Sequence, residues 1–336
     1  MVRKADHPAK GQPPLAPYGR HRVVVPVHIP SEEGYFEHAR EVLGLCLDSL
    51  RRTAGGRVAV TLVSDGSCPA VVEQLTAAAG DGWVDQVVVN EPNRGKVDAA
   101  VSAARASFED LVTIADADVL FRPGWVDAVE QLFETFPECG YASVFPSPPG
   151  LFNLTSATLL GGWMSGATRF ASVVDGHELD RFAESIGRPD LYPEHHRRVQ
   201  LVVERDGVVA CVGAPHFILT IRREVVEAIP HEPARDAIGG SETRWIDEPA
   251  DRLGLWRLST PGTLAQHMGN VPEPWMHEEV ASMPEPVDDA HHDPGPLPPA
   301  RIHPAGRIPW RARTSFVERV LRPLLERRIR ARADRV

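Results

Sequence analysis

The chain has 336 residues, the size of one large domain or two small ones. Hydrophobic residues make up 43% and charged residues 24%, values that exclude a mostly disordered, collagen-like or disulfide-stapled protein. The net charge of −10 argues against a nucleic-acid partner, because generic nucleic-acid binding needs a basic surface.

The four cysteines lie far apart and form no C-x-x-C pair, so the sequence predicts neither a zinc ribbon nor a disulfide framework. No apolar run approaches the ~18–20 residues of a membrane span. Residues 1–20 lack the apolar core of a signal peptide and are polar and Pro-rich, as expected of a disordered leader. We therefore expect a cytoplasmic protein.

The first half of the chain alternates strands and helices. Strands are predicted at 22–30, 58–65, 84–90, 110–118 and 141–146, with helices at 36–53, 70–79, 96–108 and 126–136. This alternation of helices with near-continuous apolar strands predicts an α/β fold with a mostly parallel sheet flanked by helices. Ligands of such sheets bind beyond the carboxyl ends of the strands, so the ends of these strands should share one rim.

The pattern is less regular after residue 150. Residues 210–229 predict a strand that runs into a helix, and 255–261 predict a further strand. Between them, 239–254 read as a Gly-rich loop that opens a helix with Ser241 as its N-cap. Residues 283–310 contain eight prolines, too many for regular structure, and are expected to form a loop.

The segment 311–336 differs in charge from the rest of the chain. It has nine arginines and three acidic residues, a net charge of +6, which leaves −16 on the other 310 residues. Its apolar residues recur every four positions, at Val317, Leu321, Leu325 and Ile329. We expect a basic amphipathic tail, interrupted by Pro323, that docks on the acidic body; peripheral contact with an anionic membrane and a homodimer contact are the alternatives.

Two carboxylates, Asp116 and Asp118, directly follow an apolar strand and are separated by one residue. On an extended backbone, residues i and i+2 share a face, so both can address one cation. Hard oxygen ligands suit Mg²⁺ or Mn²⁺. The alternative for this pair alone is that the two acids cap the following turn.

Four segments resemble, in order and spacing, the nucleotide-sugar glycosyltransferases of the GT-A fold, most closely the inverting family 2 type. They are VVVPVHIP (23–30), VSDGS (63–67), NRGKVDAA (93–100) and IADADVLFRPGW (114–125). The resemblance implies a GT-A domain with a nucleotide-sugar-binding half and an acceptor or catalytic half. The halves would span 21–150 and 151–282, before the Pro-rich loop 283–310 and the tail 311–336.

The resemblance also implies the residues of a donor site. These are Pro26, Val27, His28, Asp65, Arg94, Lys96, Asp116, Ala117 and Asp118. Asp65 would read the nucleotide base, and Arg94 and Lys96 would place positive charge beside the diphosphate. Mn²⁺ or Mg²⁺, held by Asp116 and Asp118, would stabilise the leaving diphosphate.

The second half of the chain carries a looser match to the family. An acid, a glycine, a proline and a histidine follow one another at Glu242, Gly254, Pro261 and His267. The resemblance makes His267 a further metal ligand. Thr243 stands where the family has a second acid, the usual catalytic base, so Glu242 is the first candidate for the base. Asp247 and Glu248 are the alternatives.

These residues predict an enzyme, a metal-dependent glycosyltransferase. It would transfer a sugar from a nucleoside-diphosphate sugar to an unidentified acceptor, with inversion at the anomeric carbon. The alternatives are a retaining GT-A glycosyltransferase and a catalytically inactive nucleotide-sugar-binding module. A sugar-1-phosphate nucleotidyltransferase would need a Gly-rich phosphate loop after the first strand, which 26–36 does not supply.

Overall fold

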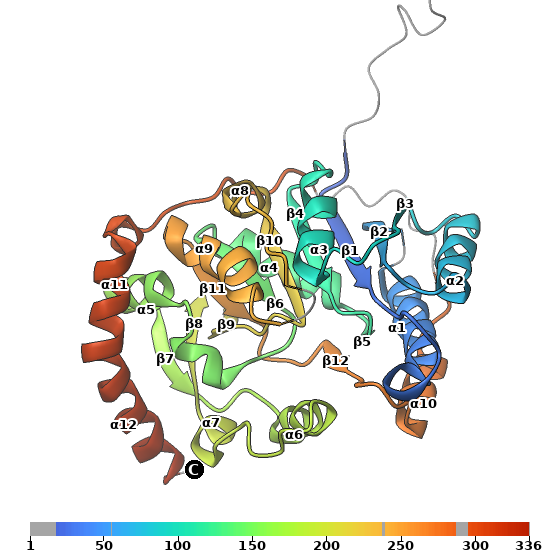
Figure 1. Cartoon of the computed structure of the whole chain (residues 1–336). Helices are drawn as coiled ribbons and strands as arrows, with labels where there is room; N and C mark the ends of the chain where they lie inside the picture. Colours follow the sequence, from blue (N-terminus) through green and yellow to red (C-terminus); the bar gives the residue numbers. More distant parts are fainter. Residues whose placement is uncertain (1–17, 55, 237–238, 287–294, 336) are drawn as a thin grey trace, which may run out of the picture.

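The computed structural model describes residues 18–54, 56–236, 239–286 and 295–335. Most of the predicted leader, 1–20, therefore lies outside the described residues, as does part of the predicted Pro-rich loop. The described chain forms a central sheet with helices on both faces, and this α/β architecture confirms the predicted fold class (Figure 1).

The main sheet runs in the order β3-β2-β1-β4-β10-β6-β11-β9-β8-β7. Its strands, in that order, are Gln86–Asn90, Ala59–Asp65, His21–Val27, Leu111–Ala115, Ile218–Arg222, Cys139–Ser143, Trp256–Ser259, Val208–Val212, Gln200–Arg205 and Thr168–Ala171. The first four are parallel to one another, as predicted. Strand β10 then pairs antiparallel with both β4 and β6, so the sheet as a whole is mixed.

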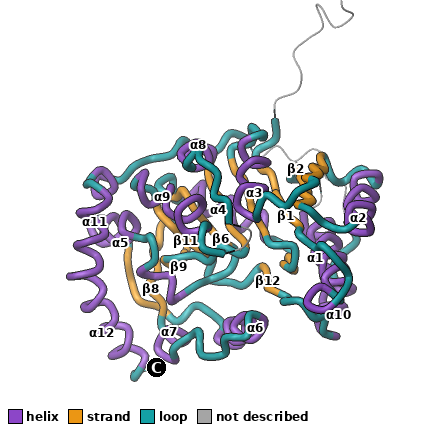
Figure 2. Tube along the Cα trace, viewed as in Figure 1, coloured by secondary structure: helices purple, strands orange, loops and turns teal. Residues whose placement is uncertain are grey.

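Helices cover both faces of the sheet (Figure 2). The α-helices are α1 (Ala39–Ala54), α2 (Pro69–Gly80), α3 (Lys96–Arg105), α4 (Trp125–Thr135), α5 (Ser156–Met164), α6 (Gly176–Ser185), α7 (Glu194–Arg198), α8 (Arg223–Ala228), α9 (Glu248–Leu253), α10 (Pro274–Ser282), α11 (Trp310–Phe316) and α12 (Arg322–Ala333). Short 3-10 turns are η1 (Gly34–Phe36), η2 (Pro148–Phe152) and η4 (Pro304–Arg307), and π-helical turns are η3 (Thr243–Asp247) and η5 (Val317–Leu321). In the described residues no helix combines the length and apolarity needed to span a bilayer.

Strand β1 is apolar on both sides because both sides are covered. Val23 and Val25 belong to the core that includes apolar side chains of α1, α2 and α4. Val24, between them, belongs to a second core with side chains of α3, α8 and α9. Since successive side chains of a strand point to opposite faces, this division explains the unbroken valine run in the sequence.

The structure corrects several predicted elements. The strand predicted at 110–118 ends at Ala115, so the two carboxylates follow it in a turn. Strands β7 and β8 were not predicted, and β9 overlaps only the start of the segment 210–229, whose predicted strand and helix correspond to β10 and α8. Ser241 is not an N-cap: its buried hydroxyl has no hydrogen-bond partner among the described residues, and a π-helical turn begins at Thr243.

The C-terminal tail is one helical rod, α11, η5 and α12, along the edge of the molecule (Figure 1). Pro323 does not interrupt it, because it occupies the first turn of α12, after the π-helical turn. The buried Arg313 fixes the rod to the body by donating hydrogen bonds to the carbonyls of Gly306, Ile308 and Asp251. The tail therefore docks on the body of its own chain, as the sequence predicted.

Candidate active site

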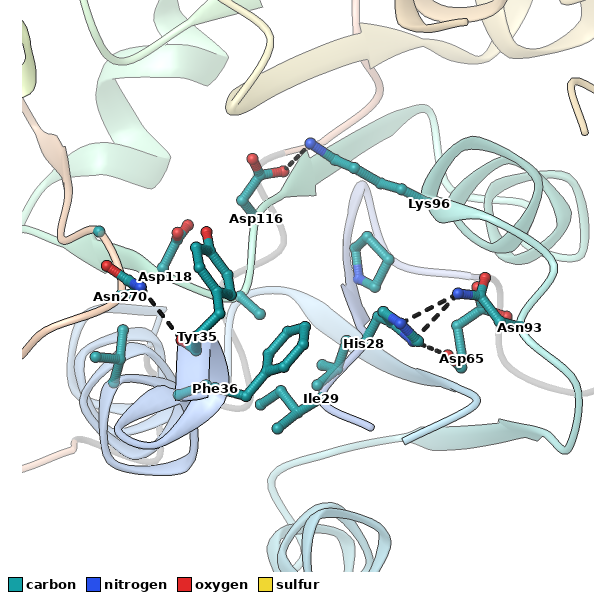
Figure 3. A pocket seen from close by; sticks show the side chains of 16 residues that line it. His28, Ile29, Tyr35, Phe36, Asp65, Asn93, Lys96, Asp116, Asp118 and Asn270 are labelled. Carbon is teal, nitrogen blue, oxygen red and sulfur yellow. Dashed lines mark hydrogen bonds and ion pairs between the residues drawn. The ribbon is translucent and has the colours of Figure 1, made fainter. Parts of the chain in front are cut away.

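A cavity of about 590 Å³ opens at the carboxyl ends of β1, β2 and β4 (Figure 3). Of the predicted donor residues, those that line it are Pro26, Val27, His28, Asp65, Lys96, Asp116, Ala117 and Asp118. The shared rim follows from the parallel registers of these strands, which bring their ends to one edge. Arg94, Glu242, Asp247 and His267 are not among the residues that line this cavity.

Asp65 is buried at the end of β2 and holds the loop that leads into α3. Its carboxylate accepts hydrogen bonds from Asn90 Nδ2 and the backbone N–H groups of Arg94 and Gly95, each at 3.0 Å. The ring Nδ1–H of His28 donates to the Asp65 carbonyl at 2.6 Å. These bonds set the shape of the cavity wall and leave the Arg94 side chain outside the lining.

Asp116, Asp118 and His267 form a cluster beside the cavity, with one potential ligand atom from each lying within 4.8 Å of the others. His267 arrives through a two-stranded ribbon in which β12 (Ala265–His267) pairs antiparallel with β5 (Val119–Phe121). Next to this pairing, the Met268 N–H donates to the Asp118 carbonyl at 2.8 Å. The ribbon thus brings a residue far along the chain to the two predicted carboxylates, Asp116 and Asp118, which we call the D-x-D pair.

The chemistry of this cluster fits a divalent cation. His267 Nε2 lies 3.3 Å from Asp118 Oδ2, whereas the buried Asp118 Oδ1 has no hydrogen-bond partner among the described residues. Burial, together with the negative charge of Asp116, raises the pKa of Asp118, although His267 acts in the opposite direction. Two carboxylates and an imidazole suit Mn²⁺ or Mg²⁺, and a cation would compensate the unsatisfied oxygen.

Lys96, the first residue of α3, supplies a fixed positive charge at this cluster. Its Nζ lies 2.6 Å from Asp116 Oδ1 (Figure 3). Burial would lower the pKa of Lys96, but Asp116, with smaller contributions from Glu242 and Asp118, raises it. The ammonium group therefore stays charged beside the D-x-D pair, and Glu242 is close enough to act on it electrostatically.

Glu242 lies at the start of the π-helical turn and is 9% exposed. Within the described part of the chain its carboxylate makes no hydrogen bond or ion pair. The neighbouring Ser241 hydroxyl is also buried without a partner there. The Glu242 carboxylate is therefore an anion without a partner in the described residues, and it lies close enough to Lys96 to interact with its charge.

Asp247, the other predicted base, is buried, with 2% of its surface exposed to solvent. Its Oδ1 accepts hydrogen bonds from Arg257 Nη2 and the Tyr141 hydroxyl, both at 3.0 Å, and its Oδ2 lies 3.6 Å from His216 Nδ1. Burial would raise the pKa of Asp247, but Arg257 and His216 lower it. This geometry keeps Asp247 from touching a substrate and gives it the role of holding Arg257 and His216.

We expect Asp247→Asn to lower the free energy of unfolding by about 3 kcal/mol, because Arg257 would keep its buried charge without an anion. The pKa of Asp247 is lower in the folded protein than in the unfolded chain, so its ionisation stabilises the fold at pH values above the unfolded-state pKa. The difference in free energy of unfolding between the wild type and the variant should therefore be largest at neutral pH and disappear as the pH falls below about 4. Urea unfolding at several pH values measures it. Glu248→Gln, which breaks a surface ion pair with Arg252, is the control and should cost about 1 kcal/mol or less.

Sequence reasoning did not select several residues that line the cavity, among them Tyr35, Phe36 and Asn270. The first two follow the end of β1, so the rim argument could have found them. Asn270 Nδ2 donates a hydrogen bond to the Tyr35 carbonyl at 3.2 Å (Figure 3). The two residues are far apart in the sequence, so no local sequence pattern predicts this contact. The pKa of His216 is raised by its contact with Asp247.

A second cavity, of about 520 Å³, lies on the other side of His267. Residues of α6 and the start of α10 line it, among them Arg181, Glu184 and Trp275. Ser185 also lines this cavity, and its hydroxyl oxygen lies 2.9 Å from His267 Nδ1. His267 therefore has one ring nitrogen at the carboxylate cluster and the other held by α6.

A comparison with known protein families finds one match, and it lies mostly in the first half of the chain. Residues 34–166 match the sequence profile of Glycosyl transferase family 2, which confirms the predicted resemblance. Asp65, Arg94, Lys96 and the D-x-D pair lie within the match, whereas Glu242 and His267 lie beyond it. No curated protein matches the chain by sequence.

Several solved structures resemble this chain in fold, and three of them are described here. One is the mannosyltransferase PcManGT from Pyrobaculum calidifontis in complex with GDP-Man and Mn²⁺: 17% identity, TM-score 0.45, covering 90% of this chain and 71% of that one. Another is glucosyl-3-phosphoglycerate synthase from Mycobacterium tuberculosis with Mn²⁺, UDP and glucosyl-3-phosphoglycerate: 17% identity, TM-score 0.41, covering 79% and 76%. S. aureus TarS is 11% identical, with a TM-score of 0.44, and the match covers 78% of this chain and 38% of TarS.

Proposed function

We propose that the protein is a metal-dependent glycosyltransferase that moves a sugar from a nucleoside-diphosphate sugar to a hydroxyl of an acceptor. The observation that supports this most strongly is the cluster of Asp116, Asp118 and His267 beside a cavity at the carboxyl ends of parallel strands. The orphaned Asp118 Oδ1 adds weight, because a buried oxygen without a partner is costly unless something binds it.

The nucleoside would occupy the cavity between the end of β1 and the loop held by Asp65. Tyr35 and Phe36 offer aromatic surface there, and the His28 ring lies beside Phe36, with the ring centroids 6.2 Å apart (Figure 3). Because the Asp65 carboxylate is already occupied by three donors, we assign it the task of positioning the wall of the cavity. The diphosphate would then lie toward Lys96 and the D-x-D pair.

Asp116, Asp118 and His267 would hold Mn²⁺ or Mg²⁺, which supplies Lewis-acid stabilisation of the leaving diphosphate when bound. Lys96 contributes a charge of the same sign from the protein itself, and Asp116 keeps that ammonium in place at 2.6 Å. Ser185 holds the His267 ring from the other side at 2.9 Å. A ligand fixed in this way needs little reorganisation when the substrate binds.

Glu242 is the base that we propose for an inverting transfer. Its carboxylate is unpaired in the described residues, and it lies close enough to the Lys96–Asp116 pair to affect the Lys96 charge. Deprotonation of the acceptor hydroxyl by this carboxylate, as the oxygen attacks the anomeric carbon, gives an inverted product. Asp247 does not compete for this role, because it is sealed and bound by Arg257.

We also propose that the enzyme acts in the cytoplasm. All four cysteines are free thiols, three of them buried, as expected of a protein that folds in a reducing compartment.

Turnover with a panel of nucleoside-diphosphate sugars tests the proposed function. The enzyme is incubated with UDP-, GDP-, dTDP-, CDP- and ADP-sugars, and release of the nucleoside diphosphate is followed with Mn²⁺ and with EDTA. We expect one nucleotide class to be hydrolysed slowly without an acceptor, and only with the metal. Release that is equal in EDTA would contradict the metal role, and no release with any donor, with or without metal, would favour an inactive binding module.

A further inference from the structure

The C-terminal rod has a second apolar face that the body does not cover. Val317, Ile329 and Ala333 are buried against the rest of the chain. On the other side lie Phe316, Val320 and Leu324, which are 40%, 41% and 50% exposed. Their spacing of four places them about one helical turn apart, so they form an exposed stripe along the rod.

Positive charge surrounds this apolar stripe. Six exposed arginines of the rod make no ion pair within the described residues: Arg311, Arg319, Arg327, Arg328, Arg330 and Arg335. Two of the three acidic residues of the tail are already neutralised, because Arg322 binds Glu318 at 3.0 Å and Glu326 at 3.1 Å. The stripe is thus bordered by cations that have no partner in the described chain.

We propose that this apolar stripe and its arginines dock the protein on an anionic lipid bilayer. A helix that lies in the interface buries its apolar side chains among the acyl chains and keeps its cations at the head groups. The long arginine side chains can reach the phosphates while their methylenes stay against lipid. The rod needs no unfolding for this, because Arg313 and Val317 anchor its other side to the body.

The charge distribution favours a lipid partner over a second copy of the chain. The stripe has only three large side chains, each about half exposed, whereas a stable protein interface buries about 1,200–2,000 Å² in total. A bilayer needs no complementary groove, and its anionic phosphates match the unpaired arginines. The whole chain carries −10 and this segment carries +6, so the segment is the part whose net charge favours an anionic surface.

Sedimentation with lipid vesicles tests the proposal and requires no sugar donor. The full chain is mixed with vesicles of phosphatidylcholine alone or with phosphatidylglycerol added. We expect binding only to the anionic vesicles, weakening as salt is raised. Replacing Arg319, Arg327 and Arg328 by Gln should weaken binding about 100-fold, and Phe316→Ser with Val320→Ser and Leu324→Ser should abolish it.

The matched control is Phe108→Ser, which removes an exposed ring outside the tail and should leave vesicle binding unchanged. Thermal melting of each variant shows that the fold is retained. Absence of wild-type binding to anionic vesicles would overturn the proposal. A dimer in light scattering that the triple Ser variant dissociates, without vesicle binding, would assign the stripe to a second copy instead.

Discussion

Asp118→Ala is expected to lower kcat by about a thousandfold or more. The substitution removes the carboxylate that reaches both His267 and the cavity, and with it the site for the cation. A loss of about 4 kcal/mol of transition-state stabilisation corresponds to this factor. Measuring kcat with the active donor over a range of Mn²⁺ concentrations tests the expectation.

The melting temperature of Asp118→Ala distinguishes a loss of catalysis from a loss of folding. Because burial disfavours the ionised Asp118, as its raised pKa shows, removing the charge should leave the melting temperature of the metal-free protein unchanged or higher. Asp190→Ala, at an exposed position outside both cavities, serves as the control and should keep full activity. An Asp118→Ala enzyme that retains metal-dependent turnover within threefold of the wild type would refute the assignment.

Glu242→Gln is expected to lower kcat by about 10²–10⁴-fold with little change in donor KM, because amide nitrogen cannot take the proton of the acceptor hydroxyl. The amide keeps the size of the side chain, so the fold should not change. Donor and acceptor kinetics of the variant measure the two parameters separately.

Glu248→Gln is the matched comparison for this base. Glu248 was the third predicted candidate, and it forms an ion pair with Arg252 at 2.6 Å. We expect near wild-type kcat for it. If Glu248→Gln loses activity and Glu242→Gln does not, the base has been misassigned. NMR of the product distinguishes inversion from retention, and a retained anomeric configuration would exclude the inverting mechanism.

The donor half of the site was largely predictable because its residues follow apolar strands. The runs at β1, β2 and β4 are long enough to show as buried parallel strands, and a parallel sheet brings their ends together. Asp65 and the D-x-D pair could therefore be placed on one rim without coordinates. Lys96 was predicted from the resemblance to the GT-A family, and its Nζ lies 2.6 Å from Asp116 Oδ1.

The second half was less predictable because its contacts depend on long-range pairing. His267 reaches Asp118 through two three-residue strands, β5 and β12, which are too short to leave a pattern in the sequence. The distinction between Glu242 and Asp247 depends on Arg257 and Tyr141, whose side chains enter from two central strands. A local motif shows that carboxylates are present but does not show which one is buried and hydrogen-bonded within the protein.

Calorimetric titration of nucleoside diphosphates is the most direct test of the central claim, a metal-dependent nucleotide site at Asp116 and Asp118. UDP, GDP, dTDP, CDP and ADP are titrated into the wild type and Asp118→Ala, each with Mn²⁺ and then with EDTA. The structure leads us to expect one nucleotide to bind the wild type with Mn²⁺ and to lose binding in EDTA and in the variant. Binding of that nucleotide with equal affinity in all four conditions, or of none in any, would contradict the claim.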